Sequence, residues 1–198
     1  MSGELDEARR PRRAPERRTQ LLEAAAELVA DRGVVGFTME GLAAHAGVSK
    51  ALPYRHFDNA DHVLVELYQL EVNALAGRIL AAIRGHHGDD LVAVAVHAYF
   101  DAIAERGVVL GRLSGTGSHV PERAAAAVGG QEAAWLERLV RTAYPQLDAA
   151  AALGLGRIVA GTLQAAGWAV ARREIRRGDA EAASVAATVA AAHALLGA

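Results

Sequence analysis

Residues 38–57 read TMEGLAAHAGVSKALPYRHF, and this stretch decides the fold because its helix signals are closely spaced. Thr38 can cap the free amides at the start of a helix. Phe37, just before the stretch, and Leu42 stand at the two positions of a hydrophobic staple, which fixes how the chain enters that helix. Gly47 then ends the helix with a sharp turn. The stretch therefore predicts a short helix bounded at both ends.

Two further helices are predicted beside this one. Ser49 is suited to cap a short third helix that runs to His56 or Phe57. Upstream, apolar residues at helical spacing predict a longer helix from Glu16 to the glycine stop at Gly33. Its apolar residues are Leu21, Leu22, Ala25, Leu28 and Val29. Two short helices joined by a glycine turn form the helix-turn-helix arrangement, in which the last helix meets base edges in the major groove.

The segment RRTQLLEAAAELVADRGVVGFTMEGLAAHAGVSKALPYRHF resembles the N-terminal domain of the TetR/AcrR transcriptional regulators. The features that match are the paired alanines of the first helix, Thr38, Leu42-Ala43, the turn Ala46-Gly47-Val48-Ser49 and the ending Tyr54-Arg55-His56-Phe57. The resemblance implies an all-α protein with a three-helix helix-turn-helix domain for DNA binding and a C-terminal helical domain for ligand binding and dimerisation. It also implies a homodimer that releases its DNA operator when a small molecule enters the C-terminal domain.

Carried onto this chain, the resemblance puts Thr38, Tyr54 and His56 on DNA phosphates and directs the start of the third helix to bases or backbone. Hydroxyl, phenol and ammonium groups are donors suited to phosphate oxygens, and Lys50 is the only lysine in the chain. Ser49 could instead be only a helix cap, and His56 could only satisfy a backbone group. The predicted DNA-binding residues are Arg17, Arg18, Thr38, Ser49, Lys50, Ala51, Leu52, Tyr54, Arg55 and His56.

Two positions depart from the family pattern. Pro53 stands where leucine or isoleucine is usual, and its missing amide hydrogen predicts a distorted start of the third helix. Ala60 stands where the family commonly has a lysine that meets phosphate, and the flanking Asp58 and Asp61 add negative charge instead. These departures leave an alternative open, in which the chain is a helical small-molecule-binding protein whose N-terminal domain binds DNA weakly or not at all.

Positive charge is concentrated near the N-terminus. Six arginines lie within residues 9–18, and Pro11 and Pro15 prevent a continuous helix there. We expect a disordered basic arm over residues 1–15, which either lies along phosphates and the minor groove or is simply a solvated tail. The formal net charge of the whole chain is only -2, so DNA binding must depend on where the positive charge sits.

Composition points to a cytoplasmic globular protein. The chain has 198 residues, 52% of them hydrophobic, which is enough for one or two small domains with a sizeable core. It has no cysteine, which favours a reducing compartment and excludes disulfides and thiolate metal sites. We expect no export signal and no membrane span, because the N-terminus is polar and no charge-free run of about 18 apolar residues follows.

After a DNA-binding domain over residues 16–62, residues 63–198 are expected to form the ligand-binding and dimerisation domain. Its first long helix is broken at residues 85–90, GHHGDD, which we interpret as a solvated loop because the wider ligand spacing of a metal site is missing. A helix from Leu91 to Glu105 comes next. The candidate ligand-binding residues are His97, Tyr99, Phe100, Arg112, His119, Trp135 and Trp168.

The glycine-rich segment that follows, residues 107–121, lacks the ending and glycine spacing of phosphate-binding loops. We expect a short helix there, then a loop beside the ligand entrance, and a further helix over residues 121–143.

Dimerisation is predicted from the last two helices. Gly154, Gly161 and Trp168 fall seven residues apart on one helix face, and helical glycines suggest close packing by a partner helix or a ligand. That helix is expected to stop at Gly178, with Asp179 capping the final helix. The final helix carries an apolar stripe of Val185, Val189, Ala192 and Leu196. Two such helices and their copies could form a four-helix bundle.

The sequence shows none of the constellations that catalysis needs. It has no cysteine nucleophile, no serine elbow and no metal-ligand spacing, so we expect no enzyme and no cofactor. The expected function is a ligand-responsive transcriptional regulator, a repressor by the commoner mode of the family, that binds a palindromic operator. Its effector is expected to be a small hydrophobic molecule, because the candidate pocket residues are mostly aromatic and aliphatic.

Overall fold

The computed structural model describes residues 14–114 and 134–197, and every regular element in these ranges is a helix. In chain order the elements are α2 (Ala14–Arg32), α3 (Met39–His45), α4 (Ala51–Tyr54), α5 (Ala60–Ala82), α6 (Gly88–Ser114), a helix over residues 134–143, α8 (Ala149–Ala171) and α9 (Arg177–Leu196). The predicted all-α class is confirmed. Two separate hydrophobic cores hold these helices together.

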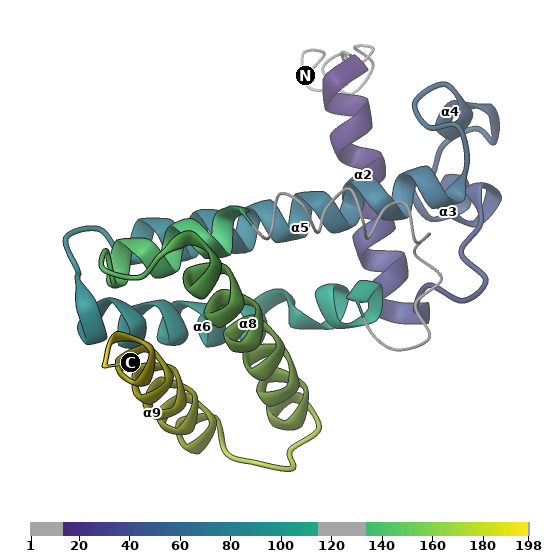
Figure 1. Cartoon of the computed structure of the whole chain (residues 1–198). Coiled ribbons are helices and arrows are strands. Elements are labelled where there is room, and N and C mark those ends of the chain that lie inside the picture. The colour runs from purple at the N-terminus through teal and green to yellow at the C-terminus, as the bar shows by residue number, and fades with distance from the viewer. Residues whose placement is uncertain (1–13, 115–133, 198) are drawn as a thin grey trace, which may run out of the picture.

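The first core joins the head, which we define as residues 14–57, to the start of α5. In Figure 1 α2 crosses α5 near its N-terminal end, and α3 and α4 lie beyond the crossing. The side chains buried there are Leu21, Ala25, Val29, Leu42, Phe57, Val63 and Leu67. Burying one leucine or phenylalanine contributes about 1.5–3 kcal/mol, so these contacts hold the short helices α3 and α4 in place.

The first helix confirms most of its prediction. It ends at Arg32, and Gly33 follows with a φ of +80°, a conformation that favours glycine. It begins at Ala14, two residues before the predicted start, because a proline at position 15 fits the first helical turn. The rest of the predicted basic arm, residues 1–13, lies outside the described residues.

Helices α5 and α6 run antiparallel along each other from the head into the C-terminal domain (Figure 1). The Asn59 side chain caps α5 by accepting a hydrogen bond from the His62 amide at 2.8 Å. The break predicted at residues 85–90 is found, with Gly85 in the left-handed region at a φ of +81°. Within this turn His86 pairs with Asp90, and the described residues contain no cluster of three or more metal-ligating side chains.

The predicted end of the next helix, at Glu105, is wrong. Helix α6 continues to Ser114 through Gly107 and Gly111, where a short separate helix was expected. Its last turns are held in the first core by the buried side chains of Val109 and Leu113. At Gly111 a Cβ atom would lie 3.4 Å from Nε1 of Trp168, so the glycine lets α8 approach closely. Tertiary packing therefore outweighs the low helix propensity of glycine.

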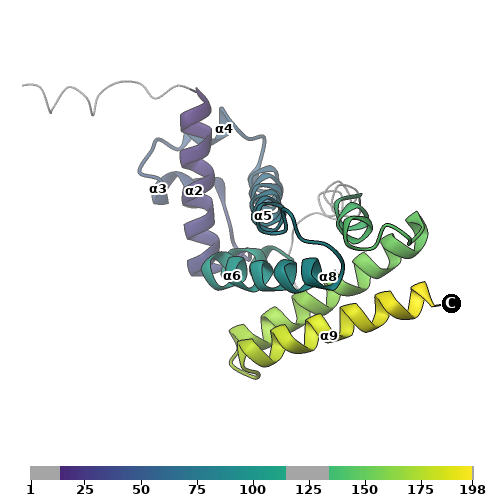
Figure 2. The same ribbon diagram turned by 90° about the vertical axis from the view of Figure 1, so that its left-hand side faces the viewer.

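Helices α8 and α9 form an antiparallel pair that packs on α6 and completes the second core (Figure 2). Helix α8 stops before the predicted Gly178, because Arg173 takes the left-handed conformation at a φ of 60°. There the Glu174 amide donates to the Ala169 carbonyl at 2.9 Å. Asp179 does not cap α9 as predicted: it lies in the first turn, and Nε of Arg176 donates to its carboxylate at 2.7 Å.

Helix α8 is long and apolar enough to cross a membrane by length and composition, although most of its residues are not buried in the described structure. Composition alone does not distinguish a membrane span from a helix whose exposed face is covered by another protein chain. Its other face packs against α6 and α9.

Candidate nucleic-acid interface and ligand cavity

The start of the helix-turn-helix unit is built as predicted. The hydroxyl oxygen of Thr38 accepts a hydrogen bond from the Gly41 amide at 3.0 Å, so Thr38 is the cap of α3. The helix ends at His45, and Gly47 turns the chain with a φ of +65°. The predicted cap and glycine turn are both confirmed.

The recognition helix α4 differs from its prediction at both ends. It has only four residues, Ala51 to Tyr54, and the cap position is taken by Lys50 without a side-chain hydrogen bond. Ser49 contributes its backbone carbonyl instead, which accepts from the Leu52 amide at 2.9 Å. The prediction that the Ser49 side chain caps this helix is therefore wrong.

Pro53 explains this tight first turn. Its missing amide hydrogen cannot bond back to Ser49, so the Leu52 amide, one residue earlier, takes that carbonyl in a 3₁₀-type bond. Pro53 is the third residue of α4, where a helix amide has no intrahelical partner anyway. Its own carbonyl accepts from the amides of His56 and Phe57, at 3.0 and 2.9 Å. The proline shapes the helix without removing a hydrogen bond from it.

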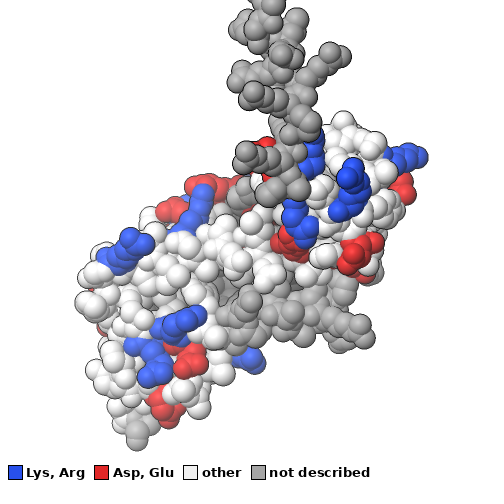
Figure 3. All heavy atoms as spheres, turned by 90° about the horizontal axis from the view of Figure 1, so that it is seen from above, with Lys and Arg blue, Asp and Glu red and all other residues white. Residues whose placement is uncertain are grey.

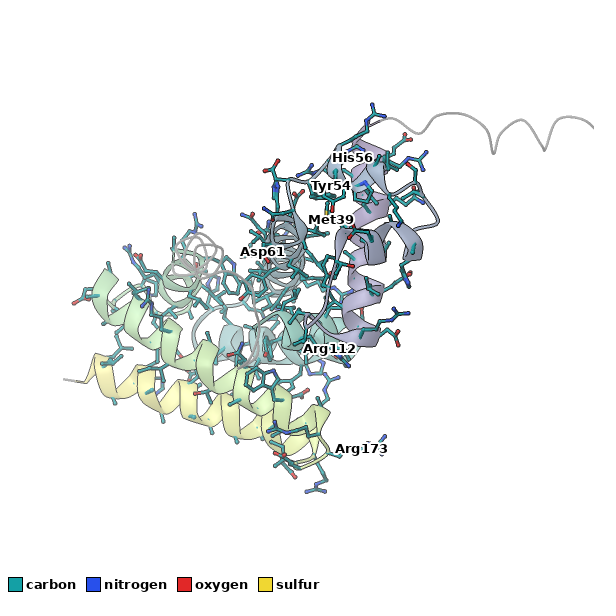
Figure 4. The ribbon with its side chains drawn as sticks, turned by 90° about the vertical axis from the view of Figure 1, so that its right-hand side faces the viewer. Met39, Tyr54, His56, Asp61, Arg112 and Arg173 are labelled. Carbon is teal, nitrogen blue, oxygen red and sulfur yellow. The ribbon has the colours of Figure 1, made fainter. Side chains whose placement is uncertain are left out.

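The predicted DNA-binding side chains of the motif are mostly accessible. Thr38, Ser49, Lys50, Ala51, Tyr54 and Arg55 are exposed, while Leu52 and His56 are half-buried. The Tyr54 side chain is 52% exposed, and its hydroxyl donates to Glu40 over a long 3.3 Å. In Figure 4 the labelled Tyr54 and His56 lie at the same end of the molecule, away from Arg112. This end carries the donors that the sequence predicted.

Charge on this end of the molecule is mixed. Figure 3 shows the face seen from the N-terminal end of α2, where basic side chains are interspersed with acidic ones. Beyond the head, Asp58 and Asp61 flank the cap of α5 and are exposed. DNA binding would therefore depend on contacts between phosphates and a few separate cations, because this face carries no continuous positive patch among the described residues (Figure 3).

Arg18 is not a free cation of the DNA-facing surface. Its Nε donates to Oε1 of Glu66 on α5 at 2.7 Å, and Nη2 donates to Oε2 of the same carboxylate. Its Nη1 donates to the backbone carbonyl of His56 at 2.5 Å. Its guanidinium also lies 4.5 Å from the ring centre of Phe57. The hydrogen bonds to Glu66 raise the pKa of Arg18 above its ordinary value. By contrast, the one bond of Arg17 to a described residue is to Gln20 of its own helix, at 3.0 Å.

The C-terminal domain contains a partly open cavity of about 930 Å³ between α5, α6, the helix over residues 134–143 and α8. Of the candidate ligand residues, Tyr99, Phe100, Trp135 and Trp168 line it. His97 and Arg112 do not line it, and His119 lies outside the described residues. The walls are mainly aliphatic and aromatic, so the cavity suits an apolar molecule.

His97 and Arg112 face away from the cavity because of their places on α6. His97 forms ion-pair contacts with Glu181 at 3.3 Å and Asp101 at 3.4 Å on an exposed surface. Arg177 of α9 bonds to the same two carboxylates, and its hydrogen bond holds the pKa of Asp101 below the ordinary value. Arg112 instead lies beside Gly33 at the end of α2, where a Cβ atom on the glycine would be 3.1 Å from Nη1.

Sequence reasoning missed several lining residues. Tyr68 and Val72 of α5, Gln164 of α8 and Tyr144 also line the cavity. The Tyr144 hydroxyl donates to Asp89 at 2.8 Å, a bond that spans two distant parts of the chain. The apolar period of α5 was visible in the sequence, but not which of its faces turns toward a cavity.

The outer face of α8 has no partner among the described residues. Ile158 is 67% exposed, and a Cβ atom added at Gly154 or Gly161 would meet nothing within 4 Å. Gly161 and Trp168 also line the cavity, so the predicted glycine face adjoins both the cavity and the open face.

A helix-turn-helix head joined by a shared helix to an all-helical domain with an apolar cavity defines a class of two-domain helix-turn-helix proteins. The profile of bacterial regulatory proteins of the tetR family matches residues 21–67. The helix-turn-helix segment of this chain is therefore of the type found in this family.

Relatives of known sequence or structure agree with this assignment. The HTH-type transcriptional activator FasR of Mycolicibacterium smegmatis is 38% identical over 98 residues, 48% of this chain and 45% of FasR. The match thus spans less than half of that relative. The fatty acid degradation regulator FadR of Bacillus halodurans has the same fold, with a TM-score of 0.66 at 17% identity over 94% of this chain and 97% of FadR.

A second solved structure is FadR of Bacillus subtilis in complex with stearoyl-CoA. Its TM-score is 0.65 at 15% identity, over 89% of this chain and 96% of that one. At these identities the two solved structures establish the fold alone.

Proposed function

We propose that the chain is a ligand-responsive transcriptional regulator that binds a palindromic operator as a homodimer and releases it when a small apolar molecule fills the cavity. One observation carries the proposal: α5 connects the two sites. Glu66 of α5 holds the end of the recognition segment through Arg18, and Tyr68 and Val72, within two turns of it, line the cavity.

The coupling follows from this connection. A ligand that displaces the cavity wall moves α5, because Val72 and Ile79 belong to that wall. Glu66 moves with α5, and Arg18 passes the displacement to the His56 carbonyl at the end of α4. Such a shift changes the distance between the two heads of a dimer, and the heads then no longer fit two adjacent major grooves.

The proposed effector is an elongated, mostly apolar molecule such as an acyl compound. Two observations support this class: the cavity walls are largely aliphatic and aromatic, and a solved relative of the same fold was crystallised with stearoyl-CoA. The volume of about 930 Å³ lies at the upper end of typical small-molecule sites. The expected mode is repression, although FasR is named an activator.

The proposed dimer uses the open face of α8 together with α9. Exposed Ile158 and the uncovered glycines of α8 give a surface on which a second copy can pack closely. Each subunit then presents one head, which requires half-sites about one helical turn, roughly 34–36 Å, or a multiple of it apart.

The alternative is a small-molecule-binding protein with a weakened head. It is favoured by Ala60 and by the exposed carboxylates of Asp58 and Asp61, which would repel phosphate. Pro53 no longer supports it, because α4 accommodates the proline without losing a hydrogen bond.

Selection of bound fragments from sheared genomic DNA separates the two functions. Wild type and Tyr54→Ala are compared at one stated salt concentration, because DNA affinities depend strongly on salt. We expect wild type alone to enrich a shared palindrome, while both proteins melt at similar temperatures because Tyr54 is exposed. Failure of folded wild type to enrich any sequence would favour the alternative function. Equal enrichment by Tyr54→Ala would remove Tyr54 from the DNA interface.

A further inference from the structure

Several aromatic side chains that carry a hydrogen-bond donor line the cavity, namely Tyr68, Tyr99, Trp135, Tyr144 and Trp168. Three of them lie on α6 or in and just after the helix over residues 134–143: Tyr99, Trp135 and Tyr144. The side chains around these three are mainly aliphatic, including Ile79, Ile103, Leu139 and Leu163. In a mainly apolar wall, the partners of the donors decide what the cavity can recognise.

The three donors differ in whether the protein satisfies them. The Tyr144 hydroxyl donates to Asp89 at 2.8 Å. Nε1 of Trp135 is shielded from solvent and has no hydrogen-bond partner among the described residues. The Tyr99 side chain is half-buried, and its hydroxyl has no acceptor among the residues that the structure describes.

An unsatisfied buried donor is unfavourable, by about 1–3 kcal/mol, and proteins rarely keep one without a use for it. An indole N–H can only donate, so its missing partner must be an acceptor. Burial raises the pKa of Tyr99 to about 12, so its phenol keeps the proton and can donate as well. The Trp135 indole therefore calls for an acceptor that the described part of the protein does not supply, and the Tyr99 phenol can donate to an atom of the same kind.

We propose that Trp135 and Tyr99 are the polar anchors of the cavity and that its ligand is an apolar molecule carrying an uncharged carbonyl oxygen. This inference rests on the proposed function, because it names the chemistry of the same effector. A ketone, ester, amide or thioester carbonyl oxygen can accept from either donor. An ionised carboxylate is disfavoured, because burying a charge costs far more than burying a carbonyl. Of the two cations that line the cavity, Arg177 is already bound to Asp101 and Glu181, and Arg157 is exposed to solvent.

Two probes of equal carbon number test the proposal on the full-length protein. Methyl nonyl ketone carries one carbonyl oxygen and undecane carries none. Displacement of an apolar fluorophore from the cavity gives the affinity for each probe, and the ratio of the two affinities reports the carbonyl contact. The ratio is measured for wild type, Trp135→Phe, Tyr99→Phe and the matched control Tyr144→Phe.

Each anchor variant should lower the ketone-to-alkane ratio about fivefold, which corresponds to about 1 kcal/mol for one hydrogen bond. Phenylalanine keeps an aromatic ring in each place, so the alkane should bind nearly as well as to wild type. Tyr144→Phe should leave the ratio unchanged, because the Tyr144 hydroxyl of the wild type donates to Asp89 and is not free to bind the carbonyl. Thermal melting verifies that each variant is folded, and Tyr99→Phe keeps the test decisive if Trp135→Phe does not fold.

The outcomes are distinguishable. If both probes bind and the ratio is the same in wild type and the two anchor variants, the carbonyl inference is wrong while the ligand cavity stands. If neither probe displaces the fluorophore from wild type, the cavity is not a site for apolar molecules. Both the proposed effector class and the carbonyl inference are then wrong.

Discussion

Arg18 of α2 and Glu66 of α5, 48 residues apart in sequence, form a two-point ion pair. Nε of Arg18 donates to one carboxylate oxygen at 2.7 Å, and Nη2 donates to the other. The third nitrogen, Nη1, donates to the His56 carbonyl at 2.5 Å. One guanidinium thus fastens the first helix, the end of the recognition segment and the helix that reaches the cavity.

Breaking this pair should loosen the head and weaken DNA binding together. Arg18→Lys keeps the charge but cannot bind Glu66 and His56 in the same fork geometry. We expect the variant to lose about 1 kcal/mol of unfolding free energy, because the pair is about one-third exposed and screened by solvent. Urea unfolding of Arg18→Lys, Glu66→Gln and the double variant measures the coupling between the two side chains.

Arg17→Ala is the matched control for Arg18. Among the described residues Arg17 bonds only within its own helix, so its loss should lower operator affinity without lowering the unfolding free energy. The opposite pattern, in which Arg18→Lys weakens DNA binding but melts like wild type, would mean that Arg18 contacts DNA directly.

Arg18 also illustrates what the sequence could not predict. The cap at Thr38 depends on residues three positions apart, so local chemistry was enough to predict it. The partner of Arg18 depends on the way α2 crosses α5, which no local pattern contains. A basic run alone predicts a DNA contact for this arginine, whereas its bonds to Glu66 and His56 are visible only in the folded structure.

The residues that line the cavity likewise include some that local sequence predicts and some that depend on how the helices pack. Tyr99 and Phe100, which the sequence marks as ligand candidates because they are aromatic residues on an apolar helix, line the cavity. Whether His97 or Arg112 joined them depended on the rotation of α6 against its neighbours. The length of α6 was missed for a related reason, since Gly107 and Gly111 signal a break locally while Val109 and Leu113 anchor the helix in the first core.

Lys50 is predicted to contribute one phosphate contact per subunit. It is exposed at the cap of α4 and carries no ion pair in the described structure. Lys50→Ala should therefore weaken operator binding and reduce the slope of log affinity against log salt by about 0.9 per lost contact. Fluorescence anisotropy over a salt series gives the slope. An unchanged slope with lower affinity would point to a base contact instead.

Gly156→Ala should destabilise the C-terminal domain. A Cβ atom there would lie 3.0 Å from Cβ of Leu136 and 3.3 Å from its backbone carbonyl, so the helix over residues 134–143 would have to shift. We expect a loss of about 1–3 kcal/mol in unfolding free energy. Gly77→Ala is the control, because nothing lies within 4 Å of its added Cβ and alanine should stabilise α5 by about 1 kcal/mol. Equal effects in thermal melts would contradict the close packing at Gly156.

Ile158→Glu should convert the proposed dimer into a monomer. Ile158 is 67% exposed on α8, so the substitution should change the stability of a monomer by less than about 0.5 kcal/mol. Placed in a dimer interface, two glutamates would be buried without partners. Val35→Glu, at a residue 70% exposed in the head, is the matched control and should leave the association state unchanged. Sedimentation velocity distinguishes the two states, and a dimeric Ile158→Glu variant would exclude this face of α8.

Tyr99 should make the unfolding free energy depend on alkaline pH. Burial raises its pKa to about 12 in the folded protein, against 10.0 ordinarily. Well below pH 10 both states keep the proton, and the contribution of Tyr99 to stability is fully present. Between these two values the unfolded chain loses the proton more readily, so the unfolding free energy falls as the pH rises. Urea titrations of wild type and Tyr99→Phe should show a shallower fall in the variant, where Tyr54 and Tyr144 still have raised pKa values. Parallel curves would mean that the Tyr99 hydroxyl is open to water in the folded protein.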